Sequence, residues 1–549
     1  MAKLANLAAA SGAEAILVNV VLSEGRGRIE PSWSLLWLSL QLFLVQSCLL
    51  ALWAVLVYPN FLSPLRHLPG PKNNSLLMGQ YYNVSKQTLC DPYRDWIESI
   101  PNDGLIRYKF IVNSERLLVT SPKALSEVLV SKNYDFVKPI QLRQALSKVI
   151  GQGIILQEDA EHKHQRKHMG PAFSTLHIKA LYPVFWSKAK ELADVLALSI
   201  IRSTSDGGLS PEIDVGEWAA RATLDIIGIA AMGQDFGCIR DPDNELSTCY
   251  RELRNVLLTK TTPGVKMLLS MLLSSSDLRL VKGNDDGLDA GGASVRRIAR
   301  DLVQKKREAR KAGSSPGIDI LSILLQSDAF SDDELVDQAM TLLMAGHETT
   351  AASITWAMYA LCRFPEVQAR LRREIMEVFP SFSHGNLGND GIDAKGTIDR
   401  LPYLSAVCNE VLRLYPPGPR TIRMAKHDTN IVGQHVPKGT PIIISPWAIN
   451  VSTELWGHDA AQFKPERWMA PGQATTGGAH GNYAFLSFLA GPRSCLGHAF
   501  ARGEFACIIL AWVARFQVEF ADPNYQLEVS TGLTIRPKLG FSVRLTPVM

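Results

Sequence analysis

The sequence predicts a mainly α-helical fold with small β-sheets, organised as one large domain behind an N-terminal transmembrane helix. Three observations support this prediction: an uninterrupted apolar run near the N-terminus, repeated helix-start and helix-stop signals after it, and few β-rich segments. The chain has 549 residues, of which 46% are hydrophobic and 20% charged, as in ordinary globular proteins. This length would accommodate three or four domains of about 150 residues, but no linker divides residues 73–549.

Composition and charge exclude several classes of protein. The 57 Lys and Arg residues nearly balance the 53 Asp and Glu residues, so the chain has no general basic field of the kind that binds nucleic acid. The large apolar share excludes a disordered chain, a collagen-like repeat and a small disulfide scaffold. A mean hydropathy of +0.03 with only 8% aromatic residues indicates that apolar residues are concentrated in one segment.

That segment covers residues 31–65, which include no Asp, Glu, Lys, Arg or His. A helix of about 20 residues crosses the hydrocarbon core of a bilayer, so we predict a membrane anchor over residues 31–58. A buried core helix is one alternative, although core helices rarely run this long without a charged face. A secretory signal peptide is another, but Glu14 interrupts the earlier apolar stretch.

Two segments flank the predicted anchor. Residues 1–30 are interpreted as a leader of uncertain role, with a weak second membrane contact as one option. Residues 59–72 contain several prolines, which fix φ and stop helices, so we predict a stiff hinge between the anchor and the body. The Lys and Arg residues on the two sides of the anchor are balanced and do not decide its orientation.

Helix signals dominate the body, residues 73–549. Ser331 and Glu334 form a capping box before a long apolar stretch, and two later helices start or stop at prolines. The predicted helices cover residues 331–362, 365–379 and 401–414. Short β-rich segments are expected at 440–445 and 541–545, and surface loops rich in Gly, Asp or Ser at 283–294 and 380–396.

One of the eight cysteines, Cys495, has neighbouring residues that indicate a role as a metal ligand. Cys495 lies in the segment FLAGPRSCLG, residues 488–497, just before a helix-like run. A helix N-terminus favours a thiolate, and a soft anionic sulfur in an apolar pocket suits a porphyrin iron, with Arg493 placed to meet a propionate. Each of these features alone would also fit a buried cysteine in a Gly-Pro loop that has no ligand role. The other cysteines lack zinc-ligand spacing and are predicted to be reduced thiols that only pack.

The same segment matches the pattern F-x-x-G-x-R-x-C-x-G at every fixed position, and in this the chain resembles the cytochrome P450 family. Three further motifs of that family occur in order before it: AGHETT at 345–350, the E-x-x-R pair of Glu410 and Arg413, and PERW at 465–468. The last has Trp where the family usually has Phe. The matches cover roughly residues 64–545 and imply a single cytochrome P450 haem domain over residues 73–549.

The resemblance implies catalytic and metal-binding roles. Cys495 is expected to ligate the haem iron through a thiolate, which favours O–O cleavage, and Phe488 to cover the sulfur. Thr349 can hydrogen-bond dioxygen or a water, and Glu348 can relay protons. The alternative for Thr349 is a hydrogen bond to the carbonyl four residues earlier. Gly346 argues against that alternative, because a helix glycine costs about 1 kcal/mol unless something such as a cofactor approaches closely.

The resemblance also implies residues that hold the cofactor. Arg423 and Arg493 match arginines that meet the haem propionates, and His162 and Arg166 match a W-x-x-x-R helix with His in place of Trp. Glu410, Arg413 and Arg467 are expected to form a buried structural network rather than a catalytic one. Thr350 is interpreted as structural, and His347 receives no role.

The function implied is that of a membrane-anchored haem-thiolate monooxygenase, which inserts one oxygen atom from O2 into a lipophilic small molecule. Electrons would come from NADPH through a flavoprotein reductase, and Lys163, His164 and Lys167 are either a solvated face or part of its docking patch. Anchored members of the family face the cytosol from the endoplasmic reticulum membrane, so we expect a single-pass anchor there. The resemblance to filamentous-fungal microsomal members favours secondary-metabolite biosynthesis of polyketides, terpenoids or alkaloids.

Three alternatives remain at this point. The protein could be a fatty-acid or xenobiotic hydroxylase of the same family, a haem-thiolate isomerase that needs no external electrons, or a haem sensor without turnover. The pair of Glu348 and Thr349 argues against the last two. The substrate pocket is expected to be lined by the mostly apolar segments 137–153, 181–197 and 533–536.

Overall fold

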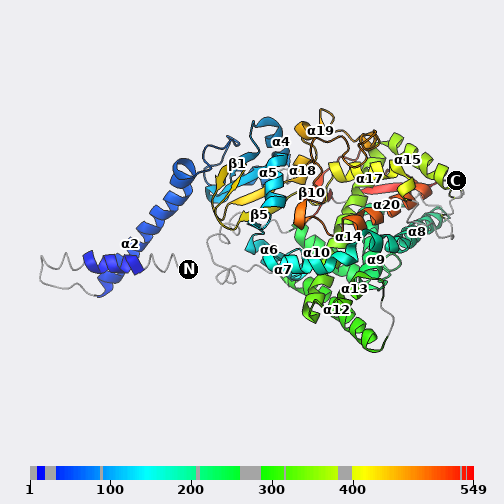
Figure 1. Ribbon diagram of the computed structural model, residues 1–549, viewed down its shortest axis with the longest axis horizontal. Coiled ribbons are helices and arrows are strands. Elements are labelled where there is room, and N and C mark those ends of the chain that lie inside the picture. Colours follow the sequence, from blue (N-terminus) through cyan, green and yellow to red (C-terminus); the bar gives the residue numbers. More distant parts are fainter. Residues whose placement is uncertain are drawn as a thin grey trace.

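The computed structural model places a helical body beside a long N-terminal helix that extends away from it (Figure 1). It describes residues 9–18, 32–86, 91–205, 211–259, 286–313, 317–380, 382, 387, 398–531, 534–538 and 541–548. The five-stranded sheet lies at the side of the body nearest to the long helix, and the α-helices fill the rest of it. This arrangement agrees with the predicted mainly α-helical fold with small sheets.

The long helix consists of α2 (Ser32–Leu52) and the π-helical segment η1 (Trp53–Leu62). Within it, Leu36–Leu62 is apolar enough and long enough to cross a membrane, and none of its most apolar window is buried against the body. Pro59 lies inside the helix, which ends at Leu62, three residues beyond the predicted start of the hinge at residue 59. An apolar, unburied helix of this kind is compatible with a membrane anchor.

Helix α14 (Asp332–Arg363) runs through the centre of the body. It begins at the predicted capping box, in which Ser331 and Glu334 each bond the backbone N–H of the other. α9 (Val215–Ile227) and α20 (His498–Arg515) pack against it, and α20 in turn packs against α8 (Thr175–Ser205). The buried face of α14 supplies most of its side chains to the main hydrophobic core.

The remaining α-helices surround this centre. Two were predicted and are confirmed: α15 begins at the expected proline, and α17 spans the expected range. The bounds are α3 (Tyr81–Lys86), α4 (Asp91–Ser99), α5 (Pro122–Ser126), α6 (Ile140–Ile150), α7 (Asp159–Met169), α10 (Glu245–Thr259), α12 (Asp286–Lys311), α13 (Ile320–Gln326), α15 (Pro365–Val378), α17 (Pro402–Leu414), α18 (Pro446–Ile449) and α19 (Thr453–Trp456).

The predicted loop at 283–294 is wrong for its larger part, because α12 starts at Asp286. Two glycines made this segment look like a loop, yet they are packing positions. A Cβ atom on Gly291 would collide with the side chain of Leu253, and one on Gly292 would collide with the carbonyl of Lys148. The glycines therefore allow α12 to approach α10 and α6 closely. The second predicted loop, 380–396, lies almost entirely outside the described residues.

The strands form four small sheets. The largest has the order β1-β2-β8-β5-β3, in which β2 and β8 are parallel and the other pairs antiparallel. The others are β4-β12-β9, β10-β11 and β6-β7. The strand bounds are β1 (Leu105–Lys109), β2 (Glu115–Val119), β3 (Phe136–Val137), β4 (Glu212–Asp214), β5 (Thr421–Ala425), β6 (Thr429–Ile431), β7 (Gln434–Val436), β8 (Pro441–Ile444), β9 (Phe516–Phe520), β10 (Val529–Thr531), β11 (Ile535–Pro537) and β12 (Ser542–Pro547). β8 and β12 confirm the two predicted β-rich segments.

Candidate functional site

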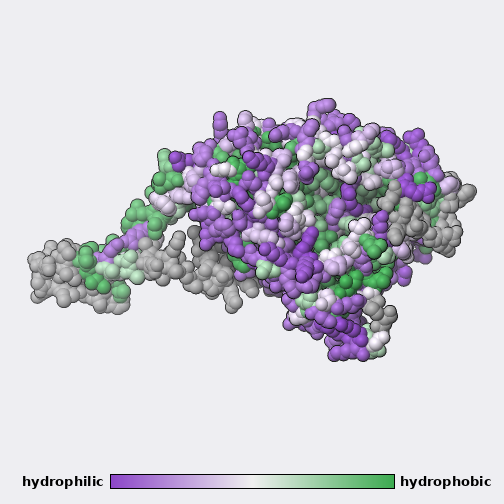
Figure 2. Space-filling view, viewed as in Figure 1, coloured by the Kyte–Doolittle hydropathy of each residue, from purple (hydrophilic) through white to green (hydrophobic). Residues whose placement is uncertain are grey.

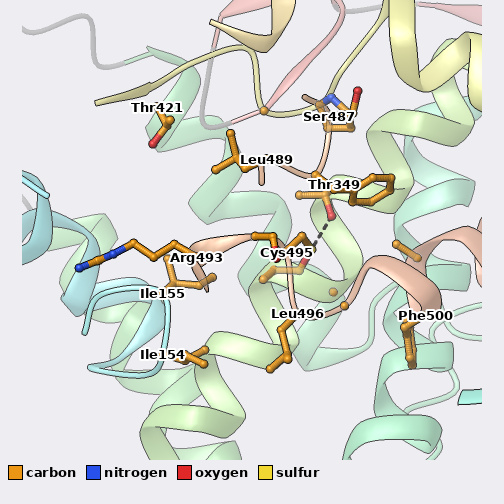
Figure 3. Close-up of a pocket in the computed structure, with 18 of the residues that line it drawn as sticks. Ile154, Ile155, Thr349, Thr421, Ser487, Leu489, Arg493, Cys495, Leu496 and Phe500 are labelled. Carbon is orange, nitrogen blue, oxygen red and sulfur yellow. Dashed lines mark hydrogen bonds between the residues drawn. The ribbon is translucent and has the colours of Figure 1, made fainter. Parts of the chain in front are cut away.

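A cavity of about 420 Å³ lies between α14, α7 and the loop that precedes α20 (Figure 3). Its lining is mostly apolar and includes Ile154, Ile155, Leu342 and Leu489. Cys495 and Thr349 both face this cavity, from the loop and from α14. The structure thus places Cys495 and Thr349, the two residues with the clearest functional roles in the sequence motifs, at the same cavity.

The predicted lining segments are largely wrong. Only Lys138 of the segment 137–153 lines the cavity, and no residue of 181–197 does. The latter segment is the middle of α8, whose apolar side chains are used in packing against α20 and are therefore not available to a pocket. The described residues 534–536 do not line the cavity either, because they pair with α14 through Glu348 and Trp356.

The loop that carries Cys495 is closed by a backbone hydrogen bond, in which the N–H of Cys495 donates to the carbonyl of Phe488 at 2.8 Å. Gly491 adopts a φ of +74°, and a Cβ atom there would collide with the carbonyl of Leu129. Only glycine fits this position without strain. The Phe488 ring lines the cavity and packs edge-on against His498, with ring centroids 4.3 Å apart.

The Cys495 side chain is exposed only to the interior of the cavity. Burial raises the pKa of its thiol, while a backbone hydrogen bond from Gly497 and the nearby Arg166 cation act to lower the pKa. The backbone at the N-terminus of α20 therefore favours the thiolate, as the sequence predicted, but desolvation outweighs this effect. A thiolate at this position needs a further cation next to the sulfur, and a bound haem iron would supply that charge.

Thr349 presents its hydroxyl at the cavity and donates a hydrogen bond to the carbonyl of Ala345 at 2.8 Å. This is the bond to the carbonyl four residues earlier that the sequence left as an alternative. It uses the hydroxyl hydrogen and leaves the oxygen lone pairs free to accept a hydrogen bond from a group in the cavity. Gly346 has a packing reason, because a Cβ atom there would collide with Ile227 of α9.

Glu348 is not brought to the cavity. Its carboxylate is buried, accepts a hydrogen bond from the hydroxyl of Thr534 at 2.9 Å and forms an ion pair with Arg536. His347 lies beside it, with 3.8 Å between Nε2 and Oε2. The acid of the predicted pair thus points toward β11, while the alcohol, Thr349, faces the cavity.

The four predicted cofactor-holding residues besides Phe488 line one side of the cavity. Arg166 donates to the carbonyl of Ser494 at 2.6 Å, next to Cys495. His162 is buried, contacts the hydroxyl of Tyr134 through Nδ1 at 3.1 Å, and burial with the nearby Arg493 lowers its pKa to about 4. His162 is therefore neutral at physiological pH, and it can offer a ring nitrogen but no charge.

Arg423 and Arg493 are buried beside a third cation that the sequence analysis missed, Lys138. The pairing of β3 with β5 sets Val137 opposite Met424, which brings Lys138 next to Arg423. Burial and the repulsion from Arg423 lower the pKa of Lys138 to about 7. A single basic residue outside any motif gives no sequence signal, because its neighbours come from distant segments.

One carboxylate, Glu158, faces these three cations. It forms an ion pair with Arg493 and lies 3.6 Å from the ammonium of Lys138, and both cations lower its pKa against the effect of burial. When Lys138 is protonated, three cations against one anion leave two positive charges in excess at a buried site, which is unfavourable unless anions balance them. A haem carries two propionates, so the charge of this cluster fits the cofactor.

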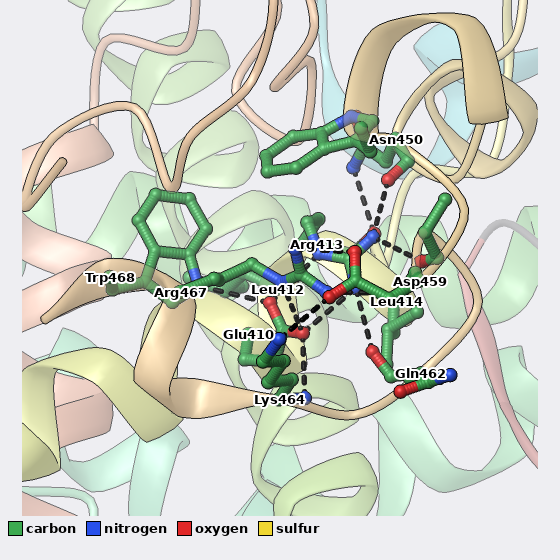
Figure 4. Close-up of polar contacts among 12 residues, drawn as sticks. Glu410, Leu412, Arg413, Leu414, Asn450, Asp459, Gln462, Lys464, Arg467 and Trp468 are labelled. Atoms are coloured by element: carbon green, nitrogen blue, oxygen red, sulfur yellow. Dashed lines mark hydrogen bonds and ion pairs between the residues drawn. The ribbon is translucent and has the colours of Figure 1, made fainter. Parts of the chain in front are cut away.

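Behind the cavity lies the predicted structural network, with Glu410 at its centre (Figure 4). Arg413 donates two hydrogen bonds of 2.8 Å to Glu410, and Arg467 donates one of 2.9 Å. Trp468 donates its indole N–H to Glu410 at 3.0 Å, which a phenylalanine at this position could not do. The departure from the family pattern therefore adds a hydrogen bond to the buried carboxylate.

The described cysteines and metal-ligand types give no sign of another metal centre. Seven cysteines in the described part of the chain are free thiols, while Cys90 lies outside it. No group of three or more His, Cys, Asp or Glu residues that could hold a metal ion occurs in the described part.

Comparisons with known proteins agree with the geometry. A sequence model of the cytochrome P450 family matches residues 104–543. The cytochrome P450 monooxygenase sphH of Aspergillus fumigatus is 44% identical over 507 residues, 90% of this chain and 91% of that protein. The cytochrome P450 monooxygenase FSL4 of Gibberella zeae is 39% identical over 516 residues, 90% of each chain.

A solved structure shows the same fold. The crystal structure of a cytochrome P450 (CYP102L1) has a TM-score of 0.65 at 24% identity and covers 81% of this chain and 92% of that chain. Members of this family hold haem through an axial thiolate, work with a redox partner and act on lipophilic substrates. The chain belongs to the cytochrome P450 family of haem-thiolate monooxygenases.

Proposed function

We propose that this monooxygenase inserts one oxygen atom from O2 into a lipophilic small molecule of secondary metabolism. The observation that carries the proposal is the placement of Cys495 and Thr349 on one cavity whose remaining lining is mostly apolar. An apolar lining favours a lipophilic substrate, because binding removes apolar surface of both partners from water. The resemblance to fungal monooxygenases supports a role in tailoring polyketides, terpenoids or alkaloids.

The residues around the cavity would hold the cofactor by charge and by ligation. Cys495 would ligate the iron, and Lys138, Arg423 and Arg493 would neutralise the two propionates. Arg166 would steady the cysteine loop through Ser494. When bound, the haem supplies the activation of dioxygen, which no side chain of the protein can perform.

Proton supply is assigned to the hydroxyl of Thr349 and the carboxylate of Glu348. The hydroxyl oxygen of Thr349 can accept a hydrogen bond inside the cavity while the same hydroxyl still donates its hydrogen bond to the carbonyl of Ala345. Glu348 can deliver protons only after it leaves Arg536 and Thr534, so the relay requires a change of its side-chain conformation. Breaking this ion pair would gate proton delivery.

The electron donor and location follow from the anchored members of the family. We assign electron supply to an NADPH-dependent flavoprotein reductase and the location to the endoplasmic reticulum membrane, with the catalytic domain on the cytosolic side. The apolar, unburied helix Leu36–Leu62 supports membrane attachment. Arg107 of β1 donates to the carbonyl of Pro59, and Asn113 donates to the carbonyl of Val55 at 3.0 Å, and these contacts would keep the body close to the bilayer surface.

A reconstitution experiment tests the proposal. The full chain in membranes is combined with a reductase, the carbon monoxide difference spectrum is recorded, and NADPH use is followed with candidate lipophilic substrates. We expect the red-shifted band of a thiolate-ligated haem in the unaltered protein and its loss in Cys495→Ser. A band without the red shift would contradict thiolate ligation, whereas a red-shifted band with no NADPH consumption in response to any candidate substrate would favour the sensor. Product formation without NADPH would favour the isomerase.

The substrate requires a separate measurement. Deletion of the gene should cause a lipophilic precursor to accumulate, and the purified enzyme should convert that precursor to a product that is one oxygen atom heavier. If the accumulating compound is a common fatty acid, the fatty-acid hydroxylase becomes the better interpretation. An unchanged metabolite profile together with oxidation of unrelated foreign compounds would favour the xenobiotic hydroxylase.

A further inference from the structure

The structure describes a short apolar helix, Ala9–Val18, before the predicted anchor. In Figure 1 it is the darkest blue helix, and it crosses α2 at some distance from the body. Side-chain hydrogen bonds join the two helices, so their overlap in this view is a true contact. The haem domain does not account for this helix, and its role is independent of the proposed reaction.

The contact between the two helices is polar and specific. The hydroxyl of Ser11 donates to the side-chain carbonyl of Gln46 at 2.9 Å, and the amide nitrogen of Gln46 contacts the carboxylate of Glu14. Ser11 is 1% exposed and Ala15 is fully buried, so the face of the helix turned toward α2 has small side chains. Ile16 and Leu17 are 59% and 68% exposed, so apolar side chains point outward.

This pattern is the one expected of helices that associate inside a bilayer. Small residues let two helices approach closely, and polar side chains pair across the contact because hydrocarbon offers them no other partner. Gln46 lies well inside the span Leu36–Leu62, where an amide without hydrogen-bond partners is strongly unfavourable. Both polar ends of the Gln46 amide find their partners on the short helix.

We infer that residues 9–18 lie in the membrane beside α2 and form with it a two-helix anchor, joined through Gln46. Ten residues of helix extend about 15 Å, half of the hydrocarbon core, so the described helix enters the bilayer without crossing it. Its outward apolar residues then face lipid. Glu14 has its partner in Gln46, as an ionisable residue inside a membrane requires.

Labelling tests this arrangement on the full-length protein. Ile16→Cys is prepared in membrane fragments opened so that both faces are accessible, and the peptide with position 16 is read by mass spectrometry after treatment with a charged maleimide. We expect labelling only after detergent is added. Arg66→Cys, at an exposed position beyond the span, serves as the positive control and should be labelled at once.

Two glutamine variants test the role of Gln46. Gln46→Leu removes both contacts, and we expect position 16 to become accessible to the charged maleimide without detergent. Gln41→Leu is the matched control, because Gln41 lies on the same helix with an exposed side chain, and protection should persist. The carbon monoxide difference spectrum of each variant establishes that the haem domain has folded.

A disulfide test separates contact within one chain from contact between copies. Ser11→Cys with Gln46→Cys should form an intramolecular cross-link under mild oxidation, whereas Ile16→Cys with Gln46→Cys should not, because Ile16 points away. Cross-linked dimers in place of the intramolecular product would overturn the inference in favour of self-association of the span. Labelling of Ile16→Cys without detergent, or removal of residues 9–18 from the mature protein, would overturn it as well.

Discussion

The side chain of Asn450 accepts a hydrogen bond of 2.8 Å from the backbone N–H of Leu486, two residues before Phe488. Its amide nitrogen donates to the hydroxyl of Ser487 at 2.8 Å and to the carbonyl of Arg413 at 3.0 Å. Arg413 also donates to the carbonyl of Asn450 at 2.8 Å. Asn450 therefore connects the buried Glu410 network to the start of the loop that carries Cys495.

We expect Asn450→Ala to loosen the cysteine loop. The change leaves the N–H of Leu486 and the carbonyl of Arg413 without their partner in a buried place, at about 1–3 kcal/mol for each group. The thermal midpoint of the holoenzyme should fall, and the carbon monoxide spectrum should convert from the red-shifted form on mild heating. Asn524→Ala, at an exposed position, should change neither quantity. An unchanged spectrum on heating would contradict a link between the network and the loop.

The indole of Trp468 provides a sharp comparison with Trp512. Trp468 donates to the buried carboxylate of Glu410, whereas the indole nitrogen of Trp512 is buried without a hydrogen-bond partner. Both changes to Phe remove similar apolar area, so their difference isolates the hydrogen bond. We expect Trp468→Phe to destabilise the protein by about 1.5–3 kcal/mol more than Trp512→Phe. Equal losses in thermal unfolding would contradict an energetic role for this hydrogen bond.

Local signals predicted helices well, and distant contacts explain most of the errors. The capping box of Ser331 and Glu334 is a property of four consecutive residues, so the start of α14 was predictable. Gly291 and Gly292 suggested a loop because the close approach of Leu253 and Lys148 is invisible in the sequence.

The same distinction holds in the candidate site. Cys495 and Thr349 lie in contiguous motifs, and the structure places both at one cavity. The direction of Glu348 could not be predicted, because its partners, Thr534 just before β11 and Arg536 within it, lie far along the chain. Lys138 escaped notice for the same reason, since the pairing of β3 with β5 alone brings it to Arg423.

Haem binding should depend on pH through Lys138. Its pKa of about 7 without the propionates means that Lys138 is largely neutral above that pH. Binding of a propionate then requires Lys138 to take up a proton, which lowers the affinity as pH rises. We expect haem affinity of the apoprotein to fall as pH rises from 6 to 9. Lys138→Arg should retain affinity across this range, because arginine stays charged, and Lys138→Met should bind weakly at every pH. Identical pH profiles for the three proteins, measured by haem titration, would exclude Lys138 from the propionate site.

Thr349 can be tested against another threonine of the same helix. Thr349 and Thr355 both donate to the carbonyl four residues earlier at 2.8 Å, but only Thr349 lines the cavity. Thr349→Ala should therefore lower the yield of product per NADPH and increase the amount of hydrogen peroxide or superoxide released. Thr355→Ala should leave the yield unchanged. Thr349→Ser keeps the hydroxyl and should restore most of the coupling. Full coupling in Thr349→Ala would contradict the proposed proton role.

The buried carboxyl of Glu504 should be protonated at neutral pH. It is fully buried in α20, neither oxygen has a hydrogen-bond partner that meets normal geometry among the described residues, and burial raises its pKa well above the usual range although the Thr350 hydroxyl opposes this shift. Because the folded pKa lies above the unfolded one, Glu504 lowers stability as pH rises through the unfolded pKa of about 4.3.

An infrared band of a protonated carboxyl should be present in the protein and absent in Glu504→Gln. That variant should gain stability relative to the unaltered protein between pH 5 and pH 7, because glutamine carries no charge whose burial must be avoided. A variant with the same pH dependence of unfolding as the unaltered protein would show that Glu504 is ionised and balanced by a nearby cation.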